Sequence, residues 1–274
     1  MTLFLLRMRP AVAASALLLA AVVAIAIIGP ALAPYNPYEI QHLKVNQPSS
    51  PQHWLGTDEF GRDLLSRLLI GIRPTVMVAM GATVIAAAFG TFLGIVGAYG
   101  PRLVSFGIMR SVDILLAFPP ILLALLAVGF WQSGVVSLMA VIGVVYTPHF
   151  ARIAQSSTLQ VMQQEYVQAE RSMGASPLRI VFRAILPNIL SPLMVQATLT
   201  IAAAILLESG LSFLGLGIVP PEPSWGQMIG TARSYLSINP MYLVWPALCL
   251  AMTVLAINII GDYLRDLLDP RLRQ

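Results

Sequence analysis

Long segments without a charged residue dominate this chain and decide the solvent in which it can fold. Residues 11–33, 74–101, 114–151, 184–207 and 234–261 contain no Asp, Glu, Lys or Arg. A helix that crosses a bilayer needs about 20 mostly apolar residues, and each segment is long enough. Charged residues make up 10% of the chain, whereas a soluble domain carries about 25%. We therefore expect an all-α, polytopic membrane protein.

The longest uncharged segment, residues 114–151, exceeds one crossing. Its middle contains the polar run Trp131-Gln132-Ser133-Gly134. We place a tight turn there between two short spans, which brings the expected number of transmembrane helices to six. Proline removes a helix hydrogen bond, so Phe118-Pro119-Pro120 is expected to kink or interrupt the third span.

The first apolar segment has two interpretations. Arg7 and Arg9 precede it, and Ala31-Leu32-Ala33 resembles a signal-peptidase site. A cleaved signal has an apolar region of about 7–15 residues, whereas residues 11–28 already span a bilayer. We interpret the segment as a retained helix, with a cleaved signal as the alternative.

The distribution of basic residues predicts the orientation. With the N-terminus in the cytoplasm, eleven Lys and Arg lie inside and five outside, as the positive-inside rule favours. An even number of spans then returns the C-terminus to the cytoplasm. The inside set is Arg7, Arg9, Arg102, Arg110, Arg152, Arg171, Arg179, Arg183, Arg265, Arg271 and Arg273, and the outside set is Lys44, Arg62, Arg67, Arg73 and Arg233.

The expected outer segment between the first two spans has two parts. Its prolines predict an extended periplasmic loop at residues 34–51. Asp58 is then expected to cap a short amphipathic helix that ends near Gly71 and lies at the membrane interface. Residues 1–73 would thus form the first helix, this loop and the interfacial helix, and residues 74–274 a five-helix core. The apolar face would hold Phe60, Leu64, Leu65, Leu68 and Leu69, and the polar face Arg62, Asp63, Ser66 and Arg67.

The chain lacks the residues that several kinds of catalysis require. The only lysine is Lys44, so the chain contains no phosphate-binding loop of the G-x-x-x-x-G-K-[ST] type, and any ATPase must be another chain. His42, His53 and His149 have no second ligand at a metal-binding spacing. We predict a subunit without catalytic residues, bound cofactor or metal.

A polar, basic stretch separates the fourth and fifth spans on the expected cytoplasmic side. The pattern of residues 155–187 predicts a helix that ends at Gly174 and a second short helix behind it. Ser176 suits the N-cap of the second helix, and Pro177 suits its first position. The expected shape is a helical hairpin that projects into the cytoplasm.

The second helix of this hairpin has an apolar stripe beside its arginines. A basic loop that only obeys the orientation rule would explain Arg179 and Arg183. It would not explain an exposed stripe, which favours a docking element for a partner protein. The stripe consists of Leu178, Val181, Phe182 and Ile185.

The same stretch resembles the motif of a known family. Gln168-Ala169-Glu170, followed by Gly174 and Ile185-Leu186-Pro187, is similar to the "EAA…G…I-LP" motif of membrane subunits of ABC importers that are fed by binding proteins. Two positions depart from the motif, since Gln168 stands where the family usually has Glu and Glu170 where it usually has Ala. The resemblance implies that the loop is the coupling helix, which docks on the ATP-binding subunit. The expected docking residues are Gln168, Ala169, Glu170, Arg171, Gly174, Ala175, Ser176, Arg179, Phe182, Leu186 and Pro187.

Four further stretches narrow the resemblance to the C-type permease of the dipeptide, oligopeptide and nickel group. They are HWLGTDEFGRDLLSRLLIGIRPTV (53–76), LESGLSFLGLG (207–217), PSWGQMI (223–229) and INIIGDYLRDLLDPRLR (257–273). The resemblance implies the type I importer permease fold in a bacterial inner membrane. It also implies a heterodimer with a B-type permease, two ATPase subunits that bind ATP and Mg, and a solute-binding protein. Pro223, Trp225 and Gly226 are the residues expected to contact that periplasmic partner.

We expect import of di- and oligopeptides, with nickel, its chelate or glutathione-like peptides as alternative cargo. A stand-alone secondary transporter or channel is the alternative of another class. The projecting loop, the few intramembrane ionisable groups and the lack of a convincing internal repeat argue against it.

A few polar residues near the membrane are candidates for the transport pathway. Glu208 is a lone carboxylate in an apolar stretch, and we expect either a pathway or gate contact or anchoring at the outer interface. Ser209, Phe118 and Pro119 are the other candidates for the pathway or gate. Asp113 is expected to form a structural ion pair with Arg110.

Overall fold

The computed structural model describes residues 10–130 and 134–268, and these residues contain no β-strand. The turn predicted at residues 131–134 falls mainly on residues 131–133, which lie outside the described residues. The order of elements is α2 (Pro10–Leu32), η1 (His42–Lys44), α3 (Leu64–Tyr99), α4 (Arg102–Leu116), α5 (Pro120–Phe130), α6 (Val135–Met162), α7 (Glu165–Ser172), α8 (Pro177–Ile180), η2 (Val181–Ile185), α9 (Leu186–Phe213), α10 (Trp225–Ala232), η3 (Arg233–Tyr235) and α11 (Met241–Leu268).

Five helical stretches among the described residues are long and apolar enough to cross a membrane. They are α2, α3, α6, the run from α8 to α9, and α11. A sixth crossing is present if α4 and α5 count as one broken span, because the pair passes the same test together and is bent by 97°. The break lies between Leu116 and Pro120, which confirms the interruption predicted at Phe118-Pro119-Pro120. The all-α, polytopic fold is confirmed.

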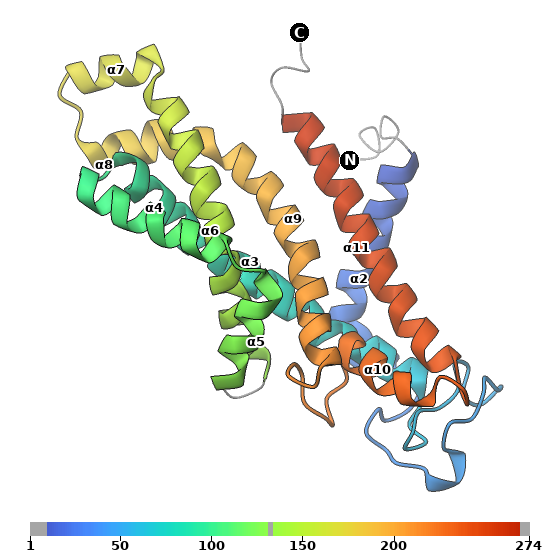
Figure 1. Ribbon diagram of the computed structural model, residues 1–274. Helices are drawn as coiled ribbons and strands as arrows, with labels where there is room; N and C mark the ends of the chain where they lie inside the picture. Colours follow the sequence, from blue (N-terminus) through green and yellow to red (C-terminus); the bar gives the residue numbers. More distant parts are fainter. Residues whose placement is uncertain (1–9, 131–133, 269–274) are drawn as a thin grey trace.

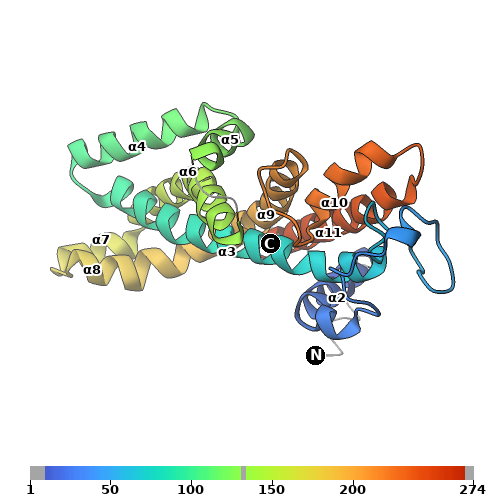
Figure 2. The same ribbon diagram turned by 90° about the horizontal axis from the view of Figure 1, so that it is seen from below.

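The two ends of the molecule differ in what they carry (Figure 1). The start of α2 and the end of α11 lie at the same end as α7 and α8, which we call the coupling end. Residues 33–63 and 214–224 and the helix α10 lie at the opposite end, which we call the loop end. Seen from the loop end, α3 runs across the molecule with α2 on one side and α9 and α10 on the other (Figure 2).

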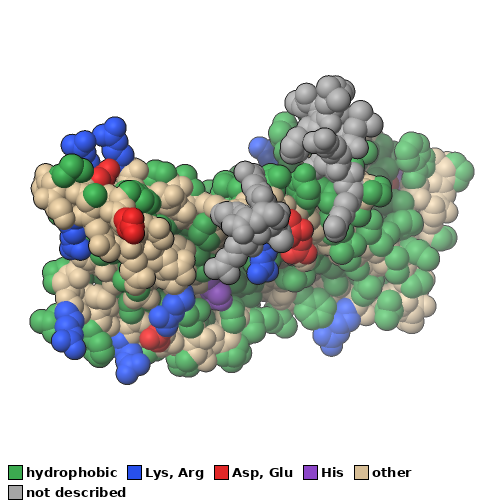
Figure 3. Space-filling model, turned by 90° about the horizontal axis from the view of Figure 1, so that it is seen from above, with side chains coloured by type: hydrophobic (Ala, Val, Ile, Leu, Met, Phe, Trp, Pro, Cys, Tyr) green, Lys and Arg blue, Asp and Glu red, His purple; other side chains and the backbone are tan. Residues whose placement is uncertain are grey.

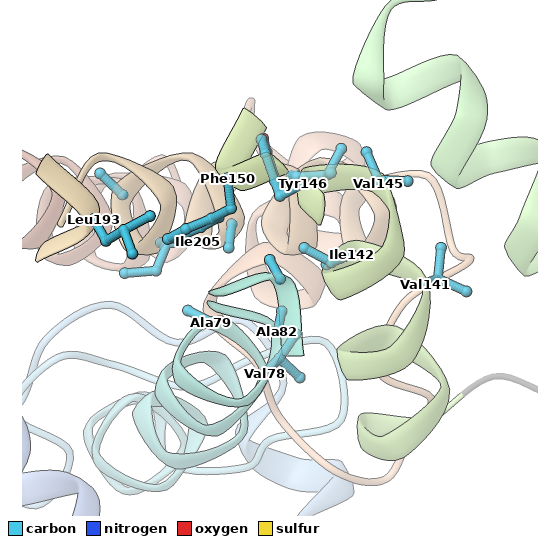
Figure 4. Close-up of a cluster of buried hydrophobic side chains, with 14 of the residues drawn as sticks. Val78, Ala79, Ala82, Val141, Ile142, Val145, Tyr146, Phe150, Leu193 and Ile205 are labelled. Carbon is cyan, nitrogen blue, oxygen red and sulfur yellow. The ribbon is translucent and has the colours of Figure 1, made fainter. Parts of the chain in front are cut away.

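The core is the seam where α3 packs on α6 and α9 (Figure 4). Small residues let the backbones of α3 and α6 approach closely, as is common in membranes. A Cβ added to Gly90 would overlap Phe150, and one added to Gly94 would overlap Ala151. Around this seam, Ala82, Ile142 and Phe150 are completely buried. The seam makes α3, α6 and α9 one packed body that joins the coupling end to the loop end.

The structure corrects the expected interfacial helix. No separate helix begins at Asp58, because α3 starts at Leu64 and continues to Tyr99. Asp63 is its N-cap and accepts a hydrogen bond from the backbone N–H of Ser66 at 2.8 Å. All four residues of the expected polar face are buried, since the preceding loop folds back over them: Arg62, Asp63, Ser66 and Arg67.

Arg62 and Arg67 belong to a larger group of polar side chains at the loop end, which we call the loop-end polar cluster: Asp58, Glu59, Arg62, Arg67 and Tyr242. Asp58 Oδ2 accepts from Arg62 Nε at 2.6 Å and pairs with Arg67 Nε at 3.3 Å. Tyr242 of α11 donates to Glu59 Oε2 at 2.6 Å. Arg67 also donates to the carbonyl of Pro37 at 3.0 Å. The cluster therefore ties residues 33–63 to α3 and α11.

Candidate functional site

We call residues 163–187 the coupling loop. The glycine turn and the start of the second helix lie where the sequence predicts them, but the helix expected to run unbroken to Gly174 is interrupted at residues 163–164, between α6 and α7. Helix α7 ends in a Schellman turn, in which Gly174 N–H donates to the Arg171 carbonyl and Ala175 N–H to the Glu170 carbonyl, each at 3.1 Å. Gly174 has the left-handed φ of +78° that this turn requires. Ser176 then caps α8 by accepting from the backbone N–H of Arg179 at 3.4 Å, and Pro177 is the first helical residue.

The second helix runs into the fifth span through a widened turn. After α8 the chain forms one π-helical turn, η2, in which Leu186 N–H donates to the Val181 carbonyl five residues earlier. The turn ends at Ile185, two residues before Pro187. Proline lacks an N–H, and in a regular α-helix its ring would clash with the carbonyl of Arg183. The wider turn avoids this conflict and keeps α8, η2 and α9 continuous.

The predicted apolar stripe is divided between the interior and the surface, so that prediction was partly wrong. Ile185 is completely buried and Val181 half-buried, whereas Leu178 and Phe182 are 70% and 65% exposed. The π turn changes the angular spacing of side chains and brings Ile180 and Ala184 inward instead.

What remains outside is an exposed apolar group that we call the tip patch: Met173, Leu178 and Phe182. Met173 is 78% exposed and precedes the glycine turn. Arg179 and Arg183 are exposed on the same short segment. Seen from the coupling end, basic side chains are spread among hydrophobic and uncharged groups, with a few acidic side chains between them (Figure 3). The tip thus combines an apolar contact area with positive charge.

Three contacts fix this loop to the transmembrane body. Val167 of α7 is buried in the main core. The Arg171 guanidinium lies 5.7 Å from the ring centre of Tyr99 at the end of α3. Asn188 Nδ2 donates to Tyr166 Oη at 3.1 Å and to the Ala184 carbonyl at 2.6 Å. Sequence reasoning missed Asn188, whose only signal is an amide in the first turn of an apolar span.

The carboxylate that this chain has two positions after the usual acidic position of the motif, Glu170, faces inward. Glu170 is half-buried, and its Oε2 has no hydrogen-bond partner among the described residues. Gln168 is exposed and donates through Nε2 to the Gln163 carbonyl at 3.3 Å. The other predicted docking residues also lie in this loop, and Ala169, Ser176 and Pro187 are exposed.

Glu208 is the centre of a second polar group, close to the loop end of α9. Its side chain is completely buried. Ser212 Oγ donates to Glu208 Oε1 at 2.7 Å, and Ser209 Oγ lies 3.4 Å from Oε2. Thr75 in α3 and Ser224 at the start of α10 lie near this carboxylate. Glu208 is therefore buried where α3, α9 and the start of α10 meet. Phe118 and Pro119 are exposed at the break between α4 and α5 and are not part of this group.

The residues predicted to contact a periplasmic partner are buried inside this chain instead. Trp225 is 2% exposed, and its Nε1 donates to the Leu68 carbonyl of α3 at 3.1 Å. A Cβ added to Gly226 would overlap the backbone of Ser209. Pro223 is buried next to Gly71. Their shared role is to pack α10 onto α3 and α9.

One expected ion pair has a different partner. Asp113 of α4 pairs with Arg152 of α6 rather than with Arg110, and both side chains are substantially exposed. Arg110 instead lies 6.0 Å from the ring centre of Phe106. The pair links α4 to α6 through two residues that lie 39 positions apart in the sequence.

Comparison with known proteins gives consistent results. Residues 86–274 match the family described as "Binding-protein-dependent transport system inner membrane component". Over 254 residues the chain is 39% identical to the di/tripeptide transport system permease protein DppC of Pseudomonas aeruginosa (strain UCBPP-PA14), covering 90% of this chain and 84% of DppC. Over 269 residues it is 39% identical to the glutathione transport system permease protein GsiD of Pectobacterium atrosepticum, covering 98% and 89%.

The fold also has a counterpart among solved structures. A chain of the inward-facing MetNI methionine ABC transporter matches with a TM-score of 0.62 and 21% identity. The match covers 74% of this chain and 96% of the MetNI chain. At this identity the likeness shows the fold, and it confirms the importer-permease fold expected from the sequence.

Proposed function

We propose that this chain, which belongs to the family of binding-protein-dependent transport system inner membrane components, carries short peptides into the cell as the permease subunit of an ABC importer. The observation that supports a peptide cargo is the similarity to both DppC and GsiD over most of the chain. Their names specify di- and tripeptides and glutathione, which is itself a tripeptide. Nickel remains the alternative cargo.

The energy for transport comes from ATP bound by partner subunits. The chain has one lysine and no phosphate-binding loop, so ATP must be bound by other chains. In the proposed assembly these are two ATPase subunits that dock at the coupling end. The tip patch provides the apolar contact, and Arg179 and Arg183 provide charge around it. Because α8, η2 and α9 are continuous, a displacement of the tip moves α9. Asn188 and Arg171 couple the same displacement to α7 and α3.

The exposed apolar side chains on the transmembrane helices support the presence of a second permease. The exposed side of α3 includes Val84, Phe89 and Phe92, each more than 60% exposed. Lipid covers part of such a surface, and a homologous B-type permease covers the rest. The solute-binding protein delivers cargo at the loop end, and the assembly sits in a bacterial inner membrane.

Reconstitution tests this function. Proteoliposomes contain both permeases and both ATPase subunits, with ATP inside at the coupling end and binding protein outside. We expect accumulation of labelled dialanine, and loss of that accumulation when either ATP or binding protein is omitted. Uptake by this chain alone would contradict the importer assignment. Uptake of nickel without uptake of peptide would assign the alternative cargo.

A further inference from the structure

We infer that a cavity at the loop end binds the two charged termini of a short peptide, through Arg73 for the carboxylate and Glu222 for the ammonium group. This inference rests on the proposed function and adds a cargo site within the permease itself. The cavity has a volume of about 590 Å³, within the range of about 300–1,000 Å³ that is usual for small-molecule sites. A dipeptide or tripeptide fits this space.

The position of the cavity suits cargo that arrives from outside. Its walls come from the end of α2, the loop before α3, the first turns of α3, the start of α6 and the loop after α9. The loops before α3 and after α9 lie at the loop end (Figure 1). A peptide released at this end meets the cavity before it meets the packed seam of α3, α6 and α9.

Arg73 and Glu222 are available for a ligand. Both are exposed and line this cavity. Among the described residues, neither forms an ion pair, whereas Arg62 and Arg67 nearby are buried and paired with Asp58. The backbone segments that carry the two charges touch, because a Cβ on Gly71 would lie 3.4 Å from the carbonyl of Pro223. The cavity thus presents one cation and one anion from adjacent segments.

This charge pair matches what all unmodified peptides share. A free peptide carries a carboxylate at one end and an ammonium group at the other. Guanidinium binds a carboxylate with two parallel hydrogen bonds, and a carboxylate accepts hydrogen bonds from an ammonium group. Recognition of the termini leaves the side chains free to vary.

The remaining walls are suited to variable side chains. Four prolines line the cavity: Pro30, Pro37, Pro74 and Pro223. Proline has no N–H, so these positions offer no backbone donor that would select a particular side chain. Met77 lines the same wall, and methionine adapts to ligands of different shape. The cavity therefore fixes the ends of a peptide and tolerates its middle.

Equilibrium binding to the purified importer, without binding protein, tests the site. The probes are labelled dialanine, C-amidated dialanine and N-acetylated dialanine. Wild type is expected to prefer free dialanine. Arg73→Gln is expected to weaken dialanine binding by about fivefold, the upper range for an accessible ion pair, and to abolish discrimination against the amide. Glu222→Gln is expected to abolish discrimination against the acetylated form.

Two control variants make the same charge changes at the loop end outside the cavity. Arg233→Gln and Glu39→Gln alter exposed residues that do not line it, and they should bind all three probes as wild type does. Unchanged binding in Arg73→Gln and Glu222→Gln would overturn the inference. A lipid occupant would also overturn it. The headgroup of phosphatidylethanolamine carries the same two charges, and the inference fails if this lipid co-purifies with wild type, is lost in Arg73→Gln, and peptide affinity is unchanged.

The uptake assay separates this inference from the proposed function. If the importer accumulates dialanine but binds none in the absence of the binding protein, the cargo site is refuted and the proposed function stands. If no peptide is accumulated under any condition, the proposed function itself is refuted, whatever the binding assay shows.

Discussion

Gly174 is the residue on which the direction of the coupling loop depends. Its φ of +78° lies in the left-handed region, which disfavours most L-residues by about 1–2 kcal/mol. A Cβ there would meet no neighbouring atom, so a substitution acts through the backbone alone. We predict that Gly174→Val reduces ATP-dependent uptake, while Gly174→Asn retains most of it because asparagine tolerates this conformation.

The assay compares uptake in proteoliposomes with the amount of permease inserted in the membrane. Both variants are expected to insert as wild type does, since Gly174 lies in an exposed turn outside the spans. Equal uptake by the Val and Asn variants would show that the turn does not aim the second helix.

Glu208 and Ser212 are predicted to act as one unit. Removal of a hydrogen-bond partner from a buried polar group typically destabilises a protein by about 1–3 kcal/mol. Ser212 Oγ both donates to Glu208 and accepts from Ile218 N–H at 3.1 Å. We expect Glu208→Gln to yield a folded protein that transports poorly, because α10 is held less firmly. A double-mutant cycle with Ser212→Ala, read from thermal stability of the purified complex, should be non-additive. Additive effects would place the two residues in separate roles.

At the scale of elements, the loop-end polar cluster decides how residues 33–63 fold onto α3. Asp58 is completely buried between Arg62 and Arg67. Asp58→Asn leaves Arg67 without a charged partner, and breaking a buried pair destabilises by about 3–5 kcal/mol. We predict a large loss of thermal stability and faster proteolysis of the outer loop.

Asp113→Asn is the matched control for this change. It removes the same charge from a pair whose side chains are 48% and 38% exposed, and such pairs contribute about 0–1 kcal/mol. Equal stability of the two variants would show that burial does not determine the strength of the Asp58 contacts.

The coupling hairpin is predicted to bind the ATPase subunit through its tip patch. Phe182 is 65% exposed on η2, and a carboxylate there would be desolvated in an apolar interface. Phe182→Glu should therefore reduce co-purification of the ATPase subunits with the permease. Leu43→Glu is the control, since Leu43 is 96% exposed at the loop end. Retention of the ATPase by Phe182→Glu would move the docking surface elsewhere.

The coupling hairpin and the loop-end polar cluster differ in how well their structure could be predicted from the sequence. Gly174, Ser176 and Pro177 act within a few residues of one another, so the end of α7 and the start of α8 were predicted correctly, whereas the break between α6 and α7 was not. Arg67 was placed on a solvent-facing side because its helix looks amphipathic. It is buried because the loop from Pro37 and the chain near Pro221 close over it. Asp113 likewise finds Arg152 across the fold. Contacts made by distant segments are not visible in local periodicity.

At the scale of the whole molecule, the sequence predicted most of the membrane-spanning helices and the end of the molecule at which the chain termini lie. Apolar segment length predicted the spans, and Phe118-Pro119-Pro120 marked the broken one. The continuity of α3 from Leu64 was missed, since the charged residues at its start suggested an interface rather than a buried helix end. The coupling hairpin and both ends of the described chain share one end (Figure 1), as an even number of crossings requires.

Cysteine labelling tests that orientation. Cys249, the only cysteine, lies half-buried in α11 and is first replaced by alanine. Leu43→Cys and Gln163→Cys then mark the loop end and the coupling end, and both positions are exposed. If the excess of basic residues keeps the coupling end in the cytoplasm, a membrane-impermeant maleimide applied to spheroplasts should label only Leu43→Cys. Both variants should react after lysis in detergent. Labelling of Gln163→Cys in intact spheroplasts would invert the molecule and place the tip patch on the side without ATP.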